Sequence, residues 1–426
     1  MAHQRKHITV FEHQAIKVGQ VFGDITFDKS KFEAFQRYHD SVGSLYYSLI
    51  YNGIRFKEYV GAIQVGDLLV EVLPKADKLP QTEGEEAKWR NILVDMVRAV
   101  SSFDVKATSS SNLKVKPNSI LDLYFELFVK EVEYLLHSGL VKRYRKTEGN
   151  VTALKGSLQF GKHIQQNLIH KERFYVRHST YDTEHQLHFI LYKTIRLLKH
   201  INTNVDLHSR IGSLLLYFPE MPDVKVSEAT FNSLMLNRKT QGYKKAMDIA
   251  RLILLQYHPD VAKGRNDVLA LMFDMNLLWE QFVYVSLRKH IRQNLATSIT
   301  ITAQTSKFFW QPDGGSRSKI RPDIVINKDK PDCVVIDTKW KNLNGYNPSP
   351  DDLRQMYVYH DYYHAKRVAL MYPCDKSSRV NGKYLDSTTS VTIDKECSVI
   401  FVSVESNIKE WQKMIYNEFE CWLMLP

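Results

Sequence analysis

Two acidic residues and a lysine stand beside two short apolar runs in the segment RPDIVINKDKPDCVVIDTKWKNL, residues 321–343. The runs IVI and CVVI flank the turn-rich NKDKPD, so the segment predicts a β-hairpin. Side chains alternate along a strand, so Asp337 and Lys339 project to one face while Thr338 points away. Pairing of the two strands would bring Asp323 beside Asp337.

Neighbouring carboxylates repel each other unless a cation lies between them. Mg²⁺ suits such a pair because it prefers hard oxygen ligands and keeps several waters, and Mn²⁺ is a second option. Lys339 would orient or deprotonate a water and stabilise the charge that develops on a phosphate. We therefore expect metal-assisted phosphodiester hydrolysis with Asp323, Asp337 and Lys339 as catalytic residues. The alternative is a surface hairpin with a solvated salt bridge.

Two predicted helices carry further polar groups. FDMNLLWEQFV places Glu280 on a long helix ahead of the hairpin. DLRQMYVYH places Gln355 and Tyr359 four residues apart, on one face of a helix. Each has an ordinary structural alternative, since Glu280 can be a helix-surface acid, and Gln355 and Tyr359 can simply pack or hydrogen-bond to the strand backbone.

The chain carries an excess of positive charge. Its formal net charge is +11 and its pI is near 9.2, which favours a polyanionic partner. Arg321 and Lys341 flank the hairpin strands and are the candidate contacts to DNA phosphates, although charges at strand ends are also commonly solvated.

Composition and cysteine use indicate a soluble globular protein. The 426 residues are enough for two or three domains, and 44% of them are hydrophobic. No run approaches the roughly 20 apolar residues that a membrane span needs, and the N-terminus lacks a signal peptide. The cysteines have no CxxC spacing and fit a reducing compartment: Cys333, Cys374, Cys397 and Cys421. We expect a cytoplasmic protein without membrane contact, zinc or an iron–sulfur cluster.

The predicted fold is multi-domain α/β. It comprises a β-rich N-terminal domain (1–110), a helical middle region (111–245) with a basic, hairpin-like excursion, and an α/β C-terminal domain (246–426). Helices are expected near 91–102 and 120–137, from a capping box that begins at Thr183, and continuously over 266–291. A linker is expected at 106–118, where the chain reads KATSSSNLKVKPN.

The segment GSLQFGKH, residues 156–163, nearly matches a phosphate-binding P-loop. Its last position is His163, so the hydroxyl group that would hold Mg²⁺ is missing. Gly156 is more simply a turn residue, and we expect no nucleotide to bind directly to this chain.

The hairpin resembles the PD-(D/E)XK nuclease superfamily, with Pro322-Asp323, thirteen intervening residues and then Asp337-Thr338-Lys339. The resemblance implies that Glu280 supports the metal site as a third acid beside Asp323 and Asp337. The Gln355 and Tyr359 pair resembles the signature helix of the RecB-like branch. A nuclease core of a mixed sheet flanked by helices is implied.

Most of the chain resembles the McrC family, the nuclease subunit of McrBC-type modification-dependent restriction systems. The blocks that carry this resemblance are RPDIVI, VVIDTKWK, QMYVY, FDMNLLWEQFV, YVGAIQVGDLLVEVLPK, LKGSLQF and DTEHQLHFILYKTIRLL. The resemblance implies a McrB-like AAA+ GTPase ring as partner, modified double-stranded DNA as substrate, and an N-terminal part that docks on the ring.

The basic excursion VKRYRKTEGN would touch the partner ring through four cations: Lys142, Arg143, Arg145 and Lys146. A solvated basic loop is the alternative for any one of them. Two other functions remain open for the whole chain, a stand-alone RecB-like repair nuclease and a non-catalytic activator of an AAA+ motor.

Overall fold

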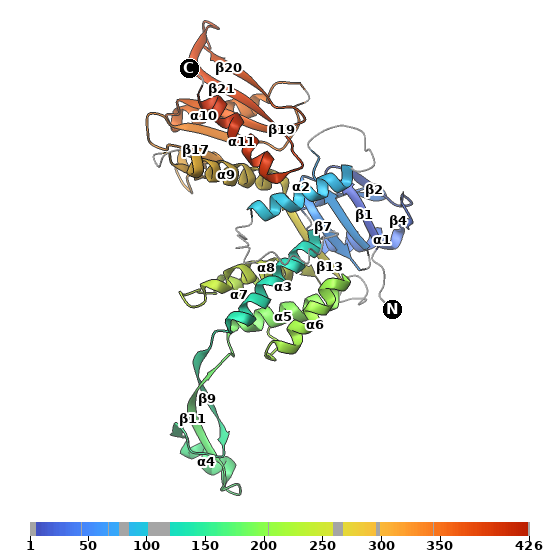
Figure 1. The fold of residues 1–426 in the computed structure, drawn as a ribbon, viewed down its shortest axis with the longest axis vertical. Coiled ribbons are helices and arrows are strands. Elements are labelled where there is room, and N and C mark those ends of the chain that lie inside the picture. Colours follow the sequence, from blue (N-terminus) through green and yellow to red (C-terminus); the bar gives the residue numbers. More distant parts are fainter. Residues whose placement is uncertain are drawn as a thin grey trace. The chain divides into compact units, whose positions relative to one another are not determined.

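A computed structural model describes residues 6–43, 45–66, 68–75, 85–100, 120–202, 204–258, 267–294, 299–343 and 345–424 (Figure 1). The chain divides into two compact units. The larger unit comprises Lys6–Ile63, Leu68–Asn112 and Met272–Pro426, and the smaller one comprises Met1–Arg5, Gln64–Asp67 and Leu113–Leu271. The predicted linker at 106–118 lies outside the described residues.

The N-terminal part of the chain is β-rich, as predicted. Strands β1 and β8 pair in parallel, with Ile8 opposite Val70, and both of these side chains are buried. The elements are β1 (Lys6–Phe11), β2 (Ala15–Lys17), β3 (Val21–Phe22), β4 (Ile25–Thr26), α1 (Lys29–Val42), β5 (Tyr47–Ile50), β6 (Gly53–Phe56), β7 (Tyr59–Val65), β8 (Leu68–Leu73) and α2 (Glu85–Val100).

The C-terminal part of the larger unit is built on a mixed sheet flanked by helices. Its six strands run in the order β14-β17-β18-β19-β21-β20, with β18, β19 and β21 parallel and the others antiparallel to their neighbours. The elements are α9 (Met275–Asn294), β14 (Ile301–Ala303), β15 (Lys307–Trp310), β16 (Ser318–Ile320), β17 (Ile324–Ile326), β18 (Val334–Thr338), α10 (Pro350–Tyr362), β19 (Arg367–Cys374), β20 (Ser378–Leu385), β21 (Thr392–Ser403) and α11 (Ile408–Leu423).

Helix α10 packs on one face of this sheet, against the central strands β18, β19 and β21. Met356 and Tyr359 of α10 are buried in one hydrophobic cluster with Val335 of β18 and Leu370 of β19. Because side chains alternate along β18, Asp337 lies on the same face as Val335 and therefore also faces α10. Helices α9 and α11 pack against each other and contact β18 and β21, respectively.

The N-terminal segment joins the C-terminal part in one unit, so the unit boundaries differ from the predicted divisions at 110 and 245. Helix α2 packs against α9 and α11. Trp89 of α2 meets Trp340 edge-on, with the ring centroids 6.4 Å apart. Trp340 also donates its indole N–H to Glu12 Oε1 at 2.8 Å. The apolar face of α2 is thus buried against residues that are far away in sequence.

The smaller unit is mostly helical and carries an extended β arm. Its elements are α3 (Ile120–Ser138), β9 (Arg143–Val151), β10 (Ser157–Leu158), α4 (Phe160–Asn167), β11 (Phe174–Asp182), α5 (Gln186–Ile201), α6 (Val205–Tyr217), α7 (Glu228–Asn232), a 3₁₀ turn η1 (Gln241–Tyr243), α8 (Lys244–Leu255), β12 (Tyr257–His258) and most of β13 (Val268–Asp274).

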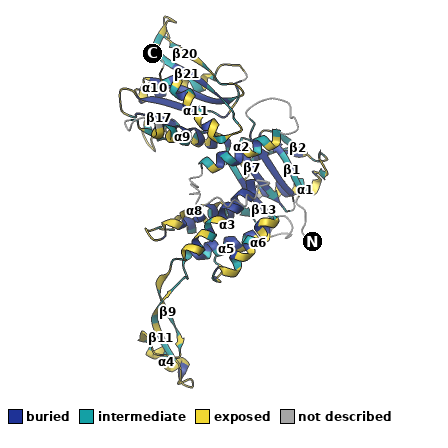
Figure 2. Cartoon of the chain, viewed as in Figure 1, coloured by how far each residue is buried: buried dark blue, intermediate teal, exposed yellow. Residues whose placement is uncertain are grey.

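The predicted basic excursion is this arm. Strands β9 and β11 pair antiparallel along their whole length, from Arg143 opposite Asp182 to Val151 opposite Phe174. Helix α4 lies at the far end of the arm (Figure 1). Figure 2 shows that exposed and intermediate residues predominate along the arm, whereas the helices beside it have buried faces.

Two helix predictions are wrong. Residues 268–274 are the strand β13, and α9 begins only at Met275, because the apolar run VLALMFD fits a buried strand as well as a helix. Helix α5 begins at Gln186 instead of Thr183. The ring of His185 caps it by accepting a hydrogen bond from the N–H of Leu187, so the predicted capping box is not used.

All four cysteines are free thiols. Cys333 and Cys397 are buried in the same hydrophobic cluster as Val335. In the part of the chain that the structure describes, no helix is both long enough and apolar enough to cross a membrane.

Candidate active site

The predicted hairpin is confirmed as β17 and β18. Ile324 lies opposite Ile336 in the antiparallel register, so Asp323, just before β17, falls beside Asp337 near the end of β18. Asp337 is only 1% exposed. Its Oδ2 lies 2.6 Å from Nζ of Lys339, so these two side chains do project to the same side of the strand.

Asp323 is held by Thr338, the residue between Asp337 and Lys339. The backbone N–H and the hydroxyl of Thr338 both donate to Asp323 Oδ2, at 2.6 and 2.8 Å. Burial nevertheless raises the pKa of Asp323 above its ordinary value. Burial also raises the pKa of Asp337, and the negative charge of Asp323 adds to this rise. The site therefore confines two carboxylates that resist being ionised together.

Lys339 lies at the end of β18, where its backbone N–H donates to Met371 O of β19 at 3.0 Å. Burial opposes its charged form, but the charges of Asp337 and Asp323 outweigh burial and raise the pKa of Lys339. Its ammonium group is therefore a fixed positive charge beside two acids.

Helix α10 brings the amide of Gln355 and the phenol of Tyr359 to these charged residues. The Ser349 side chain caps the helix, Pro350 occupies its first turn, and the early acid Asp352 suits the positive end of the helix dipole. Gln355 Nε2 lies 3.5 Å from Asp337 Oδ1 and donates to the Tyr359 hydroxyl at 2.7 Å.

The amide oxygen of Gln355 makes a further contact in this cluster. Oε1 of Gln355 accepts from Lys339 Nζ at 3.4 Å. Gln355 thus connects the phenol of Tyr359 to Asp337 of β18 and to Lys339, which follows that strand.

Glu280 lies on α9 and is close enough to Asp323 to sense its charge. Burial and the Asp323 charge raise the pKa of Glu280 to about 7, and Gln304 Nε2 donates to Glu280 Oε1 at 2.9 Å. Among the described residues, no group of three or more His, Cys, Asp or Glu side chains is arranged to hold a metal ion. The predicted set of Asp323, Asp337 and Glu280 therefore stays a prediction.

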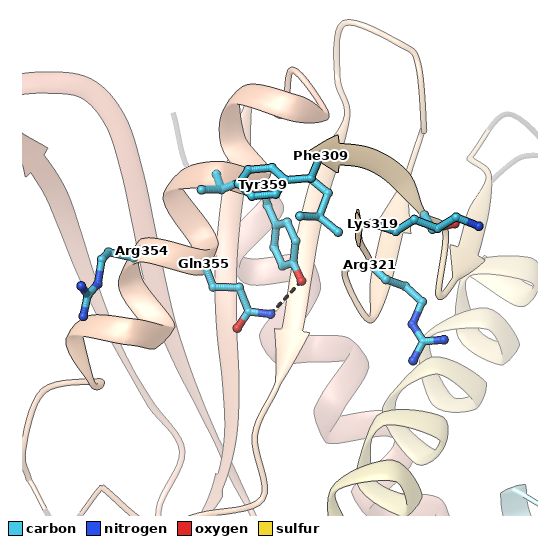
Figure 3. Close-up of a pocket in the computed structure, with 9 residues that line it drawn as sticks. Phe309, Lys319, Arg321, Arg354, Gln355 and Tyr359 are labelled. Atoms are coloured by element: carbon cyan, nitrogen blue, oxygen red, sulfur yellow. Dashed lines mark hydrogen bonds between the residues drawn. The ribbon is translucent and has the colours of Figure 1, made fainter. Parts of the chain in front are cut away.

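The two predicted DNA contacts, Arg321 and Lys341, differ in their surroundings. Exposed Arg321 lines a hollow of about 760 Å³, which Gln355, Tyr359, Phe309 and Lys319 also line (Figure 3). Lys341 is instead paired with Asp352, with Nζ 2.6 Å from Oδ2.

Three residues that contact the predicted groups were not identified from the sequence. Thr338 was expected to point away, yet it is the hydrogen-bond donor to Asp323. Gln304 is the partner of Glu280. Asp352 pairs with Lys341 and lies 4.0 Å from Lys339 Nζ. The early acidic position of Asp352 in a helix was visible in the sequence, but no local pattern links these three residues to the site.

The cations of the β arm are partly used within the arm. Arg145 pairs with Asp182 at 2.9 Å and with Glu184 at 2.8 Å, and Arg143 donates to the backbone oxygen of Glu184. Lys142 and Lys146 are exposed and form no ion pair with any described residue.

The near-match to a P-loop folds as the short strand β10 followed by α4. Lys162 pairs with Glu148 at 2.9 Å, so its ammonium is engaged by a carboxylate. Gly156 has φ near +70°, and a Cβ there would meet the backbone of β11, which explains the glycine as a turn residue.

Comparison with known proteins identifies the family. A family model described as McrBC 5-methylcytosine restriction system component matches residues 54–373, which is more than half of the chain. The chain belongs to this family. One curated relative of this McrBC family member is the type IV methyl-directed restriction enzyme EcoKMcrBC of Escherichia coli K12. It is 23% identical over 255 residues, which cover 54% of this chain and 67% of the relative.

Two solved structures share the fold of this McrBC family member. The first comes from a Thermococcus gammatolerans assembly of McrB AAA+ hexamers with bound McrC. Its TM-score is 0.70 at 18% identity, over 98% of this chain and 100% of the other. The second comes from the McrBC complex of the same organism, with a TM-score of 0.50 at 17% identity, over 68% and 89% of the two chains.

Proposed function

We propose that this chain is the DNA-cleaving subunit of a modification-dependent restriction complex, with a PD-(D/E)XK-type site. The observation that carries the proposal is the cluster of a buried carboxylate, a half-buried carboxylate and an ion-paired lysine at adjoining strand ends. The curated relative is described as a methyl-directed restriction enzyme. Double-stranded DNA that carries a modified base is accordingly the proposed substrate.

Asp323 and Asp337 are the proposed ligands of a divalent cation, with Glu280 as the supporting acid. The donor set fits Mg²⁺, which commonly binds proteins through one or two carboxylates and keeps its waters, and Mn²⁺ accepts the same oxygens. The raised pKa values of Asp323 and Asp337 support this fit, because a cation would relieve the cost of ionising both. When bound, the metal would polarise the phosphate and activate a water.

The protein's own groups would orient the substrate and stabilise charge. Lys339, held by Asp337 and Gln355, would place a positive charge against the negative charge that develops on the phosphate. Gln355 and Tyr359 would fix the position of that ammonium group. Arg321 would contact the DNA backbone at the edge of the hollow, and Lys341 could do so only after leaving Asp352.

We further propose that the chain binds a McrB-like AAA+ GTPase ring and stimulates its nucleotide hydrolysis. The structurally similar chain belongs to an assembly of McrB AAA+ hexamers with bound McrC. The β9–β11 arm supplies the proposed contact through Lys142, Arg143, Arg145 and Lys146. Nucleotide would be bound by the ring, since Lys162 of the P-loop-like segment is already paired with Glu148.

The test is DNA cleavage by the wild-type protein and by Asp337→Ala, with Mg²⁺, the cognate AAA+ ring and its nucleotide, on modified and unmodified plasmids. Asp24→Asn is a matched control that removes an exposed carboxylate from the turn between β3 and β4, in a different sheet. We expect Asp337→Ala to cut at least about a hundredfold more slowly, since a metal contributes several kcal/mol to such reactions.

Retention of partner binding and nucleotide hydrolysis by Asp337→Ala would show that the loss is confined to the nuclease step. Equal cutting by both proteins would place the chemistry elsewhere. If neither protein cuts yet both stimulate the ring, the chain is a non-catalytic activator. Cutting without the ring would favour a stand-alone repair nuclease.

A further inference from the structure

The hairpin of β15 and β16 exposes three consecutive aromatic side chains. Phe308, Phe309 and Trp310 are 54%, 46% and 58% exposed. Large aromatic groups are usually buried, because leaving them in water forgoes most of their hydrophobic stabilisation. Three in a row on a short hairpin therefore indicate a surface that contacts a ligand.

The same hairpin is rich in cations. Lys319 lies directly opposite Phe308 in the register, and its ammonium is 5.0 Å from the centre of that ring. Arg317 lies over the same ring at 5.2 Å. Neither Lys319 nor Arg321, which follows the hairpin, forms an ion pair with a described carboxylate. Their charges are thus available to an external anion.

The hairpin is anchored beside the candidate active site. Phe309 packs against Tyr362 of α10, with ring centroids 5.4 Å apart, and Lys307 donates to the backbone oxygen of Tyr362 at 3.0 Å. Figure 3 shows Lys319 and Arg321 on one side of the hollow, Gln355 on the other, and Phe309 beside Tyr359 between them. Gln355 in turn contacts Asp337 and Lys339. A chain that occupies the hollow would thus reach the reacting groups.

We propose that the β15–β16 hairpin binds a single, unpaired stretch of the DNA strand next to the bond that is cut. Lys319 and Arg321 contact its phosphates, and Phe308 and Trp310 stack on its bases. Interleaved aromatic and basic side chains are the usual surface for unpaired strands, whose bases offer free faces for stacking. This inference rests on the proposed nuclease function and adds where, and in which form, the strand is held.

The test measures binding of two fluorescent strands to the full-length protein, with Asp337→Asn as a common background so that nothing is cut. One strand is a thymidine oligonucleotide of about twelve nucleotides, within the usual site sizes, and the other is an abasic strand with the same phosphates. The base-stacking variant is Phe308→Ala with Trp310→Ala, and its control is Tyr51→Ala, a tyrosine that is 90% exposed in the same unit.

We expect the parent to bind the thymidine strand roughly tenfold more tightly than the abasic strand, and the base-stacking variant to lose this preference. Lys319→Gln and Arg321→Gln should weaken both strands equally. Each variant should make the fall of log K with log salt less steep by about 0.7, the value for one phosphate contact with a single strand. Lys383→Gln, which removes an exposed lysine of β20, should leave that slope unchanged.

The proposal is overturned if the parent binds neither strand or does not discriminate between them, or if the base-stacking variant behaves like Tyr51→Ala. It is also overturned if that variant binds both strands normally but loses the AAA+ ring, since the hairpin would then serve a protein partner. If the wild type fails to cut DNA but the parent still discriminates between the two strands, the nuclease function is refuted, and only the binding of an unpaired strand by the hairpin stands.

Discussion

At the scale of single residues, the site makes Asp323 and Asp337 harder to ionise than ordinary carboxyl groups. Asp337 is almost fully removed from water and Asp323 partly so, and removal from water favours their neutral forms. The protein opposes this tendency with fixed donors, namely two from Thr338 to Asp323 and the ammonium of Lys339 to Asp337. The hydroxyl of Thr338 is the donor that can be removed with the least change in shape.

Replacing Thr338 by valine should slow DNA cleavage by about tenfold, as is typical when a group that orients a metal ligand is lost. The Mg²⁺ concentration for half-maximal cleavage should rise, because Asp323 would keep only its backbone donor. The free energy of unfolding should fall by about 1 kcal/mol, the usual contribution of one hydrogen bond.

Thr338→Ser is the matched control, since it restores the hydroxyl and should restore the Mg²⁺ dependence. A valine variant that loses stability while its Mg²⁺ dependence stays unchanged would mean that Thr338 only supports the fold.

At the scale of elements, a buried carboxyl joins the end of β1 to the chain that follows β18. Glu12 accepts hydrogen bonds from the Trp340 indole at 2.8 Å and from the Lys75 backbone at 2.7 Å. Burial raises the pKa of Glu12 from 4.5 to about 7 despite these donors. This contact ties the N-terminal strands to the residue next to Lys339.

The raised pKa of Glu12 predicts how stability depends on pH. Between pH 4.5 and about 7 the folded state binds this proton and the unfolded state does not, so the free energy of unfolding falls as the pH rises. Glutamine resembles the protonated carboxyl. Above pH 7, Glu12→Gln should therefore be more stable than the wild type, by up to about 3 kcal/mol.

Urea unfolding at several pH values would measure this difference, which should vanish below pH 4.5. If the free energies of unfolding of the wild type and Glu12→Gln changed with pH in the same way, this would contradict the raised pKa of Glu12. A variant that is less stable at every pH would mean that the negative charge itself is needed at this position.

At the scale of the whole molecule, the proposed catalytic residues and the arm residues belong to different compact units, so their proposed functions should separate on mutation. Lys142 and Lys146 are the arm cations to test, since Arg145 is used in ion pairs with Asp182 and Glu184. Replacing both lysines by glutamine should weaken binding to the AAA+ ring by about tenfold at low salt, with less effect at high salt.

Binding to the ring and stimulated GTP hydrolysis would be measured together. The control is Arg238→Gln with Lys239→Gln, which removes two exposed charges elsewhere in the same unit. The two pairs of variants should have the same melting temperature. Equal weakening by both pairs would indicate a general effect of net charge, and the arm would lose its proposed role.

The sequence by itself determined the chemical groups of the site and the elements that carry them. The β17–β18 hairpin and the shared face of Gln355 and Tyr359 follow from periods of two and about four residues, which are local properties of strands and helices. The mixed C-terminal sheet with its flanking helices and the family were likewise foreseen. Local periodicity failed only where an apolar run was ambiguous, as in β13.

Only the tertiary structure decided which distant groups support the site. The donation from Thr338 to Asp323, the pairing of Lys341 with Asp352, and the burial of Glu12 against Trp340 join residues that no periodic pattern relates. The same holds for the N-terminal segment, which shares a unit with the C-terminal part instead of standing alone. The reason is physical: local patterns indicate which face of an element is buried, whereas long-range packing decides what buries it.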